Sequence, residues 1–482
     1  MRKSIKRCLT VALSVLVCSL SCVPAAAEVK NFVIDTDNNM LPIPETYTVT
    51  NVIKNLDGTD IAFKNAEDLF VDSEDNIYVA DTGNNRVLKL NSQGKVLLEI
   101  KTAFLKNLNS PRGVFVDSDL NIWIADTGNQ RLEVVTKDAK DYIEYKKPSG
   151  ITDSKGATFD IEKVVVNDMG YIFALKGAYV MKMDMSNTFQ GYMGAKNVDF
   201  SFSRFLIRTF GSEAQRRATE ALRPTSYNNL TIASDGNLYG VLSEGTSGQI
   251  RRLNSVGTNT YPESSYGFMG YYKEGAILPT EPTFHDITVD NQGIVSVVDQ
   301  NTGLIYQYDK EGNLLTTFGG KGDKKGTFKS PCSIAIDSKN RLYVLDYSET
   351  AACIQVFSET NFITLVHEAI NLQLDGEYTK AQDMWEDILK IDSSYFVAHK
   401  SIGKIQYKQG KYTESMASYK MAEDKSGYSE AFSEARHEVF RHYFFWIVVV
   451  IVAIIVVFIK TFTAIKKRAD KWAFDIEMKG DM

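Results

Sequence analysis

The stretch DSEDNIYVADTGNNRV, residues 72–87, decides the fold, because it is repeated 45 residues later as DSDLNIWIADTGNQRL, residues 117–132. Ten of the sixteen positions are identical, and changes such as Tyr78 to Trp123 keep the character of the side chain. In each copy a short β-rich run follows Asp, Ser and Asn and precedes Thr-Gly-Asn, which is the pattern of strand, turn and strand. A repeat of this period indicates an architecture built from similar β units.

Four weaker copies of this unit follow. Each begins with a small or polar anchor residue and places a strand about six residues further on. The six anchors are Asp72, Asp117, Asn167, Ala233, Asp290 and Asp337. Six units of four strands are typical of a six-bladed β-propeller, which we expect over residues 43–357. The β-branched run at residues 45–53 has no unit of its own, and we expect it to close the ring as the outer strand of the sixth blade.

The segment SPRGVFVDSDLNIWIADTGNQRLEVV, residues 110–135, closely resembles the consensus of the NHL-repeat family. The resemblance implies an all-β, NHL/TolB-like propeller of six blades. It is specific in the first two units, fair in the last two and faint in the third and fourth. An open β-sandwich is the alternative, but it explains six similar units poorly.

The N-terminus, residues 1–27, has the pattern of a secretory signal peptide: a basic start, an apolar run and an Ala-x-Ala cleavage site. A lipoprotein signal at Cys22 is the alternative. Cys8 and Cys18 also fall in this segment, so the mature chain keeps only Cys332 and Cys353. We expect one strand between these two, hence a separation of about 9–10 Å, and therefore buried thiols without a disulfide.

Two inserts interrupt the propeller pattern. Residues 186–224 interleave arginines with aromatic residues, which suits a docking helix or a helix that only covers one face. Residues 256–283 contain YPESSYGFMGYYKEG. That aromatic stretch suits a binding loop around Tyr266, or equally an outer strand, because GFMG aligns with GYMG at Gly191.

Residues 361–442 change to a helical pattern with a 34-residue period, and they resemble tetratricopeptide repeats. Four pairs of positions recur: Gly376 and Gly410, Tyr378 and Tyr412, Ala381 and Ser415, Trp385 and Tyr419. The resemblance implies a surface for a protein partner, with Tyr378, Trp385, Tyr412 and Tyr419 as the contact residues. A rigid spacer is the alternative.

Residues 443–465 are expected to form one transmembrane helix, because a long uncharged run begins with interfacial aromatic residues. The tail, residues 466–482, is rich in Lys and Arg near the membrane. The positive-inside rule therefore predicts a cytoplasmic tail and an extracytoplasmic bulk, in a single-pass protein of the cell membrane.

Candidate site residues lie five positions before each anchor, where inner strands begin at the axial mouth. This ring contains Glu67, Arg112, Glu162, Asn228, His285 and Cys332, and the next ring contains Asp68, Gly113, Lys163, Asn229, Asp286 and Ser333. We expect ligand binding, if any, at a subset of these positions: Glu67, Asp68, Arg112, Glu162, Asn228, His285 and Asp286. A ring of mutually paired charges without a ligand is the alternative.

Two families with similar propellers bear on the chemistry of this mouth. Six-bladed lactone hydrolases bind a divalent metal through carboxylates and amides, which Glu67, Asn228 and Asp286 resemble in residue type. Amidating lyases need several histidines around zinc, and His285 is the only one in this region. The sequence predicts no cofactor, although it leaves a divalent metal at the mouth open.

The overall expectation is a membrane-anchored scaffold of bacterial type, not an enzyme, that binds protein partners through propeller and helices. The formal charge of −6 gives no reason to expect nucleic acid. Proteins of this kind resemble accessory subunits of carbohydrate transport complexes. The alternatives are a metal-dependent lactonase-like hydrolase and a receptor for a sugar or peptide.

Overall fold

The computed structural model describes residues 31–480, except 36, 55, 57–61, 104–105, 150–157, 178, 194–226, 243–244, 246, 274–275, 279 and 348–351. The predicted signal peptide with Cys8, Cys18 and Cys22 lies outside the described residues, as does most of the insert at 186–224. The chain divides into two compact units, Met1–Asn371 and Leu372–Met482.

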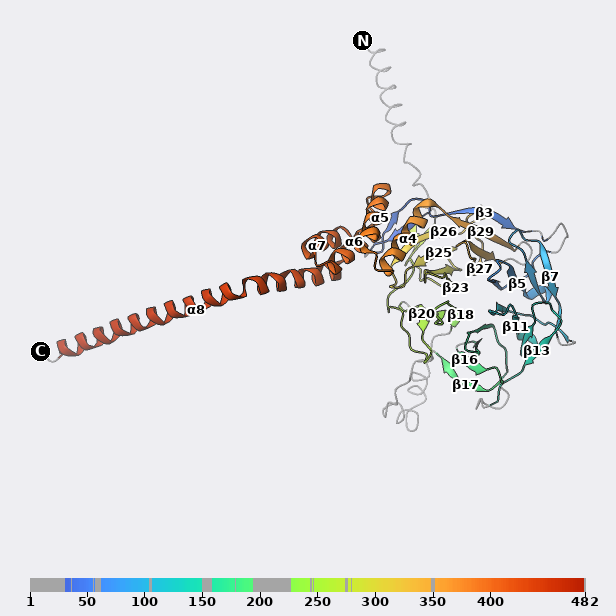
Figure 1. Cartoon of the computed structure of the whole chain (residues 1–482), viewed down its shortest axis with the longest axis horizontal. Helices are drawn as coiled ribbons and strands as arrows, with labels where there is room; N and C mark the ends of the chain where they lie inside the picture. The colour runs from blue at the N-terminus through green and yellow to red at the C-terminus, as the bar shows by residue number, and fades with distance from the viewer. Residues whose placement is uncertain are drawn as a thin grey trace, which may run out of the picture. The chain divides into compact units, whose positions relative to one another are not determined.

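Six antiparallel sheets surround a central axis in the first unit (Figure 1). Their inner strands are β4 (Asp68–Val71), β10 (Gly113–Val116), β14 (Lys163–Val166), β18 (Tyr227–Ile232), β23 (Phe284–Val289) and β27 (Pro331–Ile336). Each inner strand packs against the next, and β27 packs against β4. The ring is therefore closed, and the predicted six-bladed β-propeller is confirmed.

The first three blades have the four strands that the repeats predict. Blade one adds β5 (Ile77–Asp81), β6 (Arg86–Leu90) and β7 (Val96–Ile100) to β4. Blade two adds β11 (Ile122–Asp126), β12 (Arg131–Val135) and β13 (Tyr142–Tyr145), and blade three adds β15 (Tyr171–Lys176), β16 (Tyr179–Asp184) and β17 (Phe189–Met193). Second strands such as β5 and β11 are buried along their whole length, which explains their unbroken apolar runs. A short hairpin, β8 (Thr102–Ala103) and β9 (Lys106–Asn107), links the first two blades.

Blade four departs from the pattern. Its sheet contains β18, β19 (Leu238–Leu242) and β20 (Ile250–Leu253), and the GFMG segment at 267–270 is not a strand, so that prediction is wrong. The reason is aromatic packing: the Tyr266 ring lies edge-on to Tyr308 at 5.2 Å, and its hydroxyl donates to the Pro262 carbonyl. A separate hairpin follows, β21 (Tyr271–Lys273) and β22 (Ala276–Leu278).

Blades five and six are completed by the N-terminal segment. Blade five contains β23, β24 (Val295–Asp299), β25 (Leu304–Tyr308) and β26 (Leu314–Gly319), and β1 (Phe32–Ile34) and β2 (Met40–Pro42) extend it. The sequence did not predict these two strands, since propeller structure was expected only from residue 43. Blade six contains β27, β28 (Leu342–Asp346) and β29 (Cys353–Glu359), and β3 (Tyr47–Ile53) pairs with β29 as its outer strand. The predicted closure of the ring is confirmed.

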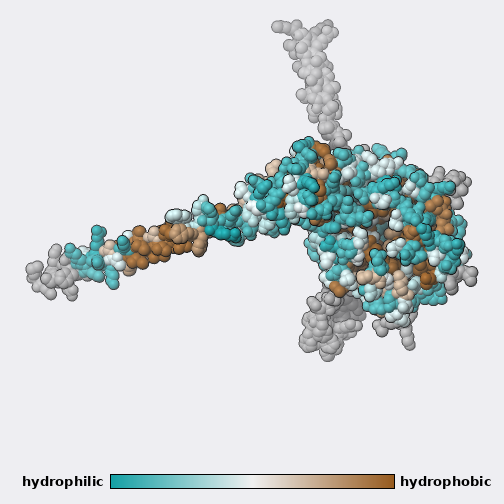
Figure 2. All heavy atoms as spheres, in the orientation of Figure 1, coloured by the Kyte–Doolittle hydropathy of each residue, from teal (hydrophilic) through white to brown (hydrophobic). Residues whose placement is uncertain are grey.

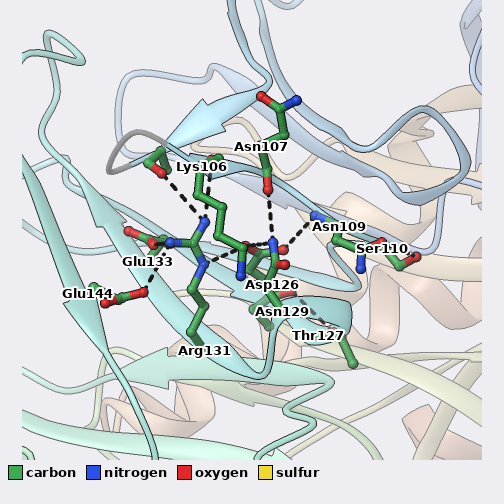
Figure 3. Close-up of polar contacts among 12 residues, drawn as sticks. Lys106, Asn107, Asn109, Ser110, Asp126, Thr127, Asn129, Arg131, Glu133 and Glu144 are labelled. Atoms are coloured by element: carbon green, nitrogen blue, oxygen red, sulfur yellow. Dashed lines mark hydrogen bonds and ion pairs between the residues drawn. The ribbon is translucent and has the colours of Figure 1, made fainter.

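The Asp-Thr-Gly-Asn-x-Arg part of the repeat forms a network of hydrogen bonds and an ion pair at the turn between the second and third strands of a blade (Figure 3). In blade two, Asp126 accepts hydrogen bonds from Arg131 Nε at 2.7 Å, Asn129 Nδ2 at 2.8 Å and the backbone N–H of Asn109 at 2.7 Å. Blade one repeats the pattern with Asp81 and Arg86. These repeated polar residues therefore stabilise the blades.

The anchor residues explain a second repeated feature. Asp72 accepts backbone N–H groups of its own turn, and the Tyr78 hydroxyl donates to Asp72 Oδ2 at 2.9 Å. In blade two, Trp123 Nε1 donates to Asp117 Oδ2 at the same distance, so Tyr and Trp are interchangeable here.

The two remaining cysteines agree with the sequence prediction. Cys332 on β27 and Cys353 on β29 are both buried and free, with β28 between them. Burial raises the pKa of both thiols.

A helix follows the propeller: α4 (Asn361–Leu374) begins in the first unit and ends in the second. The second unit continues with α5 (Tyr378–Ile391), α6 (Phe396–Lys408), α7 (Tyr412–Met421) and α8 (Lys425–Gly480). Gly376 and Gly410 precede α5 and α7 with φ of 81° and 76°, a conformation that favours glycine, and this explains their recurrence at a 34-residue offset.

Helix α8 carries the predicted membrane span. It is long and apolar enough to cross a membrane by length and composition. Figure 2 shows the apolar band on this helix, with hydrophilic segments on both sides. The four aromatic side chains from Tyr443 to Trp446 are all more than half exposed, which suits contact with a membrane interface.

Candidate functional site

One arginine, Arg112, connects two other members of the first ring at the axial mouth. Arg112 Nε donates to Glu67 Oε2 at 2.6 Å, and Arg112 Nη1 donates to Glu162 Oε1 at 2.8 Å. Three neighbouring blades thereby contribute one charged network. Burial by itself would lower the pKa of Arg112, but the two carboxylates together raise it.

The other members of this ring make separate contacts. Asn228 Nδ2 donates to the Phe284 carbonyl of the next blade at 2.6 Å. The pKa of His285 is lowered, because burial and the positive charge of Arg112 both disfavour its protonated form. The Cys332 thiol lies 3.5 Å from the Ala66 and Leu345 carbonyl oxygens. The predicted positions thus share the mouth, but only Glu67, Arg112 and Glu162 form a single network.

The second ring is a buried polar network. Lys163 Nζ lies 2.6 Å from both carboxylate oxygens of Asp68. Ser333 Oγ donates to Asp286 Oδ2 at 2.6 Å, and the Ile334 N–H donates to the same oxygen at 2.8 Å. Burial raises the pKa of Asp286 to about 7, although the nearby Lys163 ammonium lowers it.

Gly113 explains how this network is possible. A Cβ at this position would lie 2.6 Å from the Glu162 carbonyl oxygen and 2.9 Å from Lys163 Cα. Real Cβ atoms do not approach backbone atoms so closely, so the second and third inner strands can be this near each other only with glycine at this position.

The predicted metal ligands do not fit a divalent cation. Glu67 already pairs with Arg112, whose guanidinium supplies a positive charge between the carboxylates of the mouth. Asp286 accepts hydrogen bonds on both oxygens, from the Ile287 N–H on one and from Ser333 and Ile334 on the other. Asn228 and the carboxylates are therefore engaged within the propeller, and their arrangement supports no reaction step through a bound metal.

A cavity that the sequence did not reveal lies beyond the second ring. It has a volume of about 350 Å³ and extends from Lys163 and Asp286 to the anchor turns at the opposite end of the inner strands. Phe70, Thr231 and Thr288 line it between these two levels. Sequence reasoning missed it because the width of an axial channel depends on how far the inner strands stand apart, which no local pattern records.

The aromatic loop near Tyr266 is not presented to solvent as a binding loop. Tyr261, Tyr266 and Phe268 are at most 3% exposed and belong to the hydrophobic cluster of blades four and five. The Tyr261 hydroxyl donates to the Asp309 carbonyl at 2.7 Å. These rings are therefore part of the hydrophobic core of blades four and five.

The predicted partner residues of the helical unit divide into two pairs. Trp385 is fully buried and Tyr419 is 7% exposed, so both support the packing of the helices and are not available to a partner. Tyr378 is 37% exposed and Tyr412 is half-buried, at the first positions of α5 and α7. Only this second pair can contribute to a surface.

Comparison with known proteins supports the repeat assignment. Residues 63–90 and 108–135 match the NHL repeat family, and these ranges contain the first three strands of blades one and two. No curated protein matches the chain.

Among solved structures, a streptogramin B lyase is similar at 11% identity and a TM-score of 0.43, covering 65% of this chain and 98% of the other. A gluconolactonase from Xanthomonas campestris is similar at 12% identity and a TM-score of 0.40, covering 70% and 97%. Virginiamycin B lyase from Staphylococcus aureus, with quinupristin, is similar at 12% identity and a TM-score of 0.40, and the match covers 60% of this chain and 80% of the other. The propeller assignment rests on the strand pairing described above, and these distant likenesses add nothing about activity.

Proposed function

We propose that this chain is a membrane-anchored interaction protein, exported with its propeller and helices outside the cytoplasm. In this role it is an accessory subunit of a membrane complex, of the kind that transports carbohydrates. The apolar band of α8 supports the anchor, and the Lys- and Arg-rich residues that follow support a cytoplasmic tail.

One observation carries the proposal. The charged groups at the axial mouth are paired with each other, Arg112 with Glu67 and Glu162, and Lys163 with Asp68. A network of paired side chains makes this part of the propeller rigid. Function then has to be argued from the particular surfaces that the chain offers. The helical unit offers a surface of its own, since Tyr378 and Tyr412 repeat at a 34-residue offset.

Affinity purification of the full-length protein from gently solubilised native membranes, with mass spectrometry, tests this proposal. We expect a membrane protein partner that is lost from the double variant Tyr378→Ala/Tyr412→Ala. Tyr428→Ala is the matched control, because Tyr428 is exposed to a similar extent on α8. Recovery of the wild-type chain without any partner would contradict the proposal.

We do not propose lactone hydrolysis, because Arg112 pairs with Glu67, one of the candidate metal ligands, and places a positive charge next to it. An assay of the full-length protein with gluconolactone and added calcium checks this choice. Turnover that disappears in Glu67→Ala would reverse it.

A further inference from the structure

The axial cavity is lined by an aromatic residue and by threonines that take no part in the charged networks of the mouth. Its wall on one side is the ring of Phe70, which packs against Phe115 at 4.9 Å between centroids. On the other side the lining includes Thr231 on β18 and Thr288 on β23, in neighbouring blades. Neither hydroxyl has a hydrogen-bond partner among the described residues, and the Thr288 residue is only 8% exposed. Unpartnered hydroxyls opposite an aromatic face suit a ligand with both C–H and O–H groups.

The charges around the cavity argue against an anion. Its lining includes the carboxylates of Asp72, Asp286, Asp290 and Asp337. Lys163 is the one cation among the described lining residues, and its ammonium is already bound by Asp68. An anionic ligand would therefore meet net repulsion.

The same carboxylates are not free to bind a cation. Asp72 accepts the Glu74 N–H on one oxygen and the Tyr78 hydroxyl on the other, and Lys89 lies 3.7 Å away. Asp337 pairs with Arg341 at 2.6 Å and also accepts the Tyr343 hydroxyl. Asp290 accepts the N–H groups of Gln292 and Ile294 on one oxygen. The charges of Asp72 and Asp337 are thus satisfied within their own blades, and these contacts favour a neutral ligand over a cation.

We propose that this cavity binds a small neutral polyol, such as a monosaccharide or an inositol, between Phe70 and the hydroxyls of Thr231 and Thr288. A volume of about 350 Å³ lies at the small end of the range of about 300–1,000 Å³ that is typical of ligand pockets. Ligand access is from the anchor-turn end, where Ser73, Ser234 and Ser338 are exposed. This proposal does not depend on the protein-binding role proposed above.

Isothermal titration of the full-length protein in detergent with D-glucose, myo-inositol and D-glucuronate tests the proposal. We expect at least one of the two neutral probes to bind with a Kd of about 1 mM or lower, and glucuronate to bind at least about tenfold more weakly. Binding of neither neutral probe, or equal binding of glucuronate, would overturn the proposal.

Variants locate the site. The double variant Thr231→Val/Thr288→Val should weaken binding by about tenfold, as expected from the loss of two hydrogen bonds. Thr317→Val is the matched control, because Thr317 is buried on β26 with an unpartnered hydroxyl among the described residues and does not line the cavity. Ala335 lines the cavity and also packs in the core of blades six and one, so Ala335→Leu adds bulk at both places. The variant should abolish binding, and it serves as a test where its thermal unfolding stays cooperative. Unchanged binding in Ala335→Leu would place the ligand elsewhere and overturn the proposal.

Discussion

The Lys163 ammonium on β14 lies 2.6 Å from each carboxylate oxygen of Asp68 on β4, two blades away around the ring. The blade between them contributes Gly113, which has no side chain to intervene. This contact joins blades that share no sheet, so it stabilises the closed ring and not any single blade. It also holds a buried positive charge next to Asp286.

Removal of the Lys163 charge should destabilise the propeller strongly. Lys163→Met would leave Asp68 buried without its cation, which typically costs about 3–5 kcal/mol. A lower thermal unfolding midpoint of the full-length protein is the expected result. Lys140→Met is the control, since Lys140 pairs with Asp138 on the exposed surface and should change the midpoint little. Equal effects of the two variants would contradict this account of the network.

Asp286 should make stability depend on pH in an unusual direction. Its pKa is raised from 3.8 to about 7, so the folded protein binds this proton more tightly than the unfolded chain does. Its contribution is therefore fully present below about pH 4 and is lost as the pH rises to about 7, at no more than about 1.4 kcal/mol per pH unit.

Unfolding midpoints of wild type and Asp286→Asn between pH 4 and pH 8 measure this contribution. The asparagine variant should lose less stability over that range than the wild type does. Asp138→Asn, at an exposed position, should follow the wild type. Parallel curves for wild type and Asp286→Asn would show that Asp286 is ionised in the folded state throughout.

Blade four offers a stabilising substitution. Its anchor is Ala233, and the buried Tyr239 hydroxyl, which corresponds to that of Tyr78, has no hydrogen-bond partner among the described residues, although Arg252 lies nearby. Ala233→Asp should supply the missing acceptor and add about 0.5–1.5 kcal/mol to the free energy of unfolding. The gain should disappear in the Tyr239→Phe background. An equal gain in both backgrounds would assign it to the turn alone.

The two cysteines should be unreactive in the folded protein. Cys332 and Cys353 are buried, and burial raises the pKa of each thiol, which disfavours the reactive thiolate. Native full-length protein should therefore resist maleimide labelling, whereas protein in denaturant should label at both positions. Rapid labelling of either thiol under native conditions would contradict the packing of blade six.

The sequence predicted those features that a local pattern encodes. The anchor turns follow from the short repeated motif. The closing strand β3 was predicted from a β-branched run that belongs to no repeat unit. The Asp126–Arg131 ion pair lies within the repeat, but the sequence analysis did not predict it. The strands β1 and β2 were missed, because they add to blade five from a distant part of the chain without copying the repeat.

The candidate site was only partly predictable. The spacing before each anchor placed Glu67 and Arg112 at one mouth, but it could not say that they pair, since pairing depends on side-chain direction across blades. Likewise, the 34-residue period identified Tyr378 and Trp385 as equivalent to Tyr412 and Tyr419, yet could not separate the exposed pair from the buried pair. Burial of a whole helix face is a property of the packed unit.

The most direct test of the proposed function is the mass of the intact particle that contains this chain after gentle extraction from native membranes. We expect a heteromeric assembly for the wild type and for Tyr428→Ala, and a smaller particle without the partner for Tyr378→Ala/Tyr412→Ala. A particle that contains only this chain in the wild type, alone or as a homo-oligomer, would contradict the proposal that it is an accessory subunit.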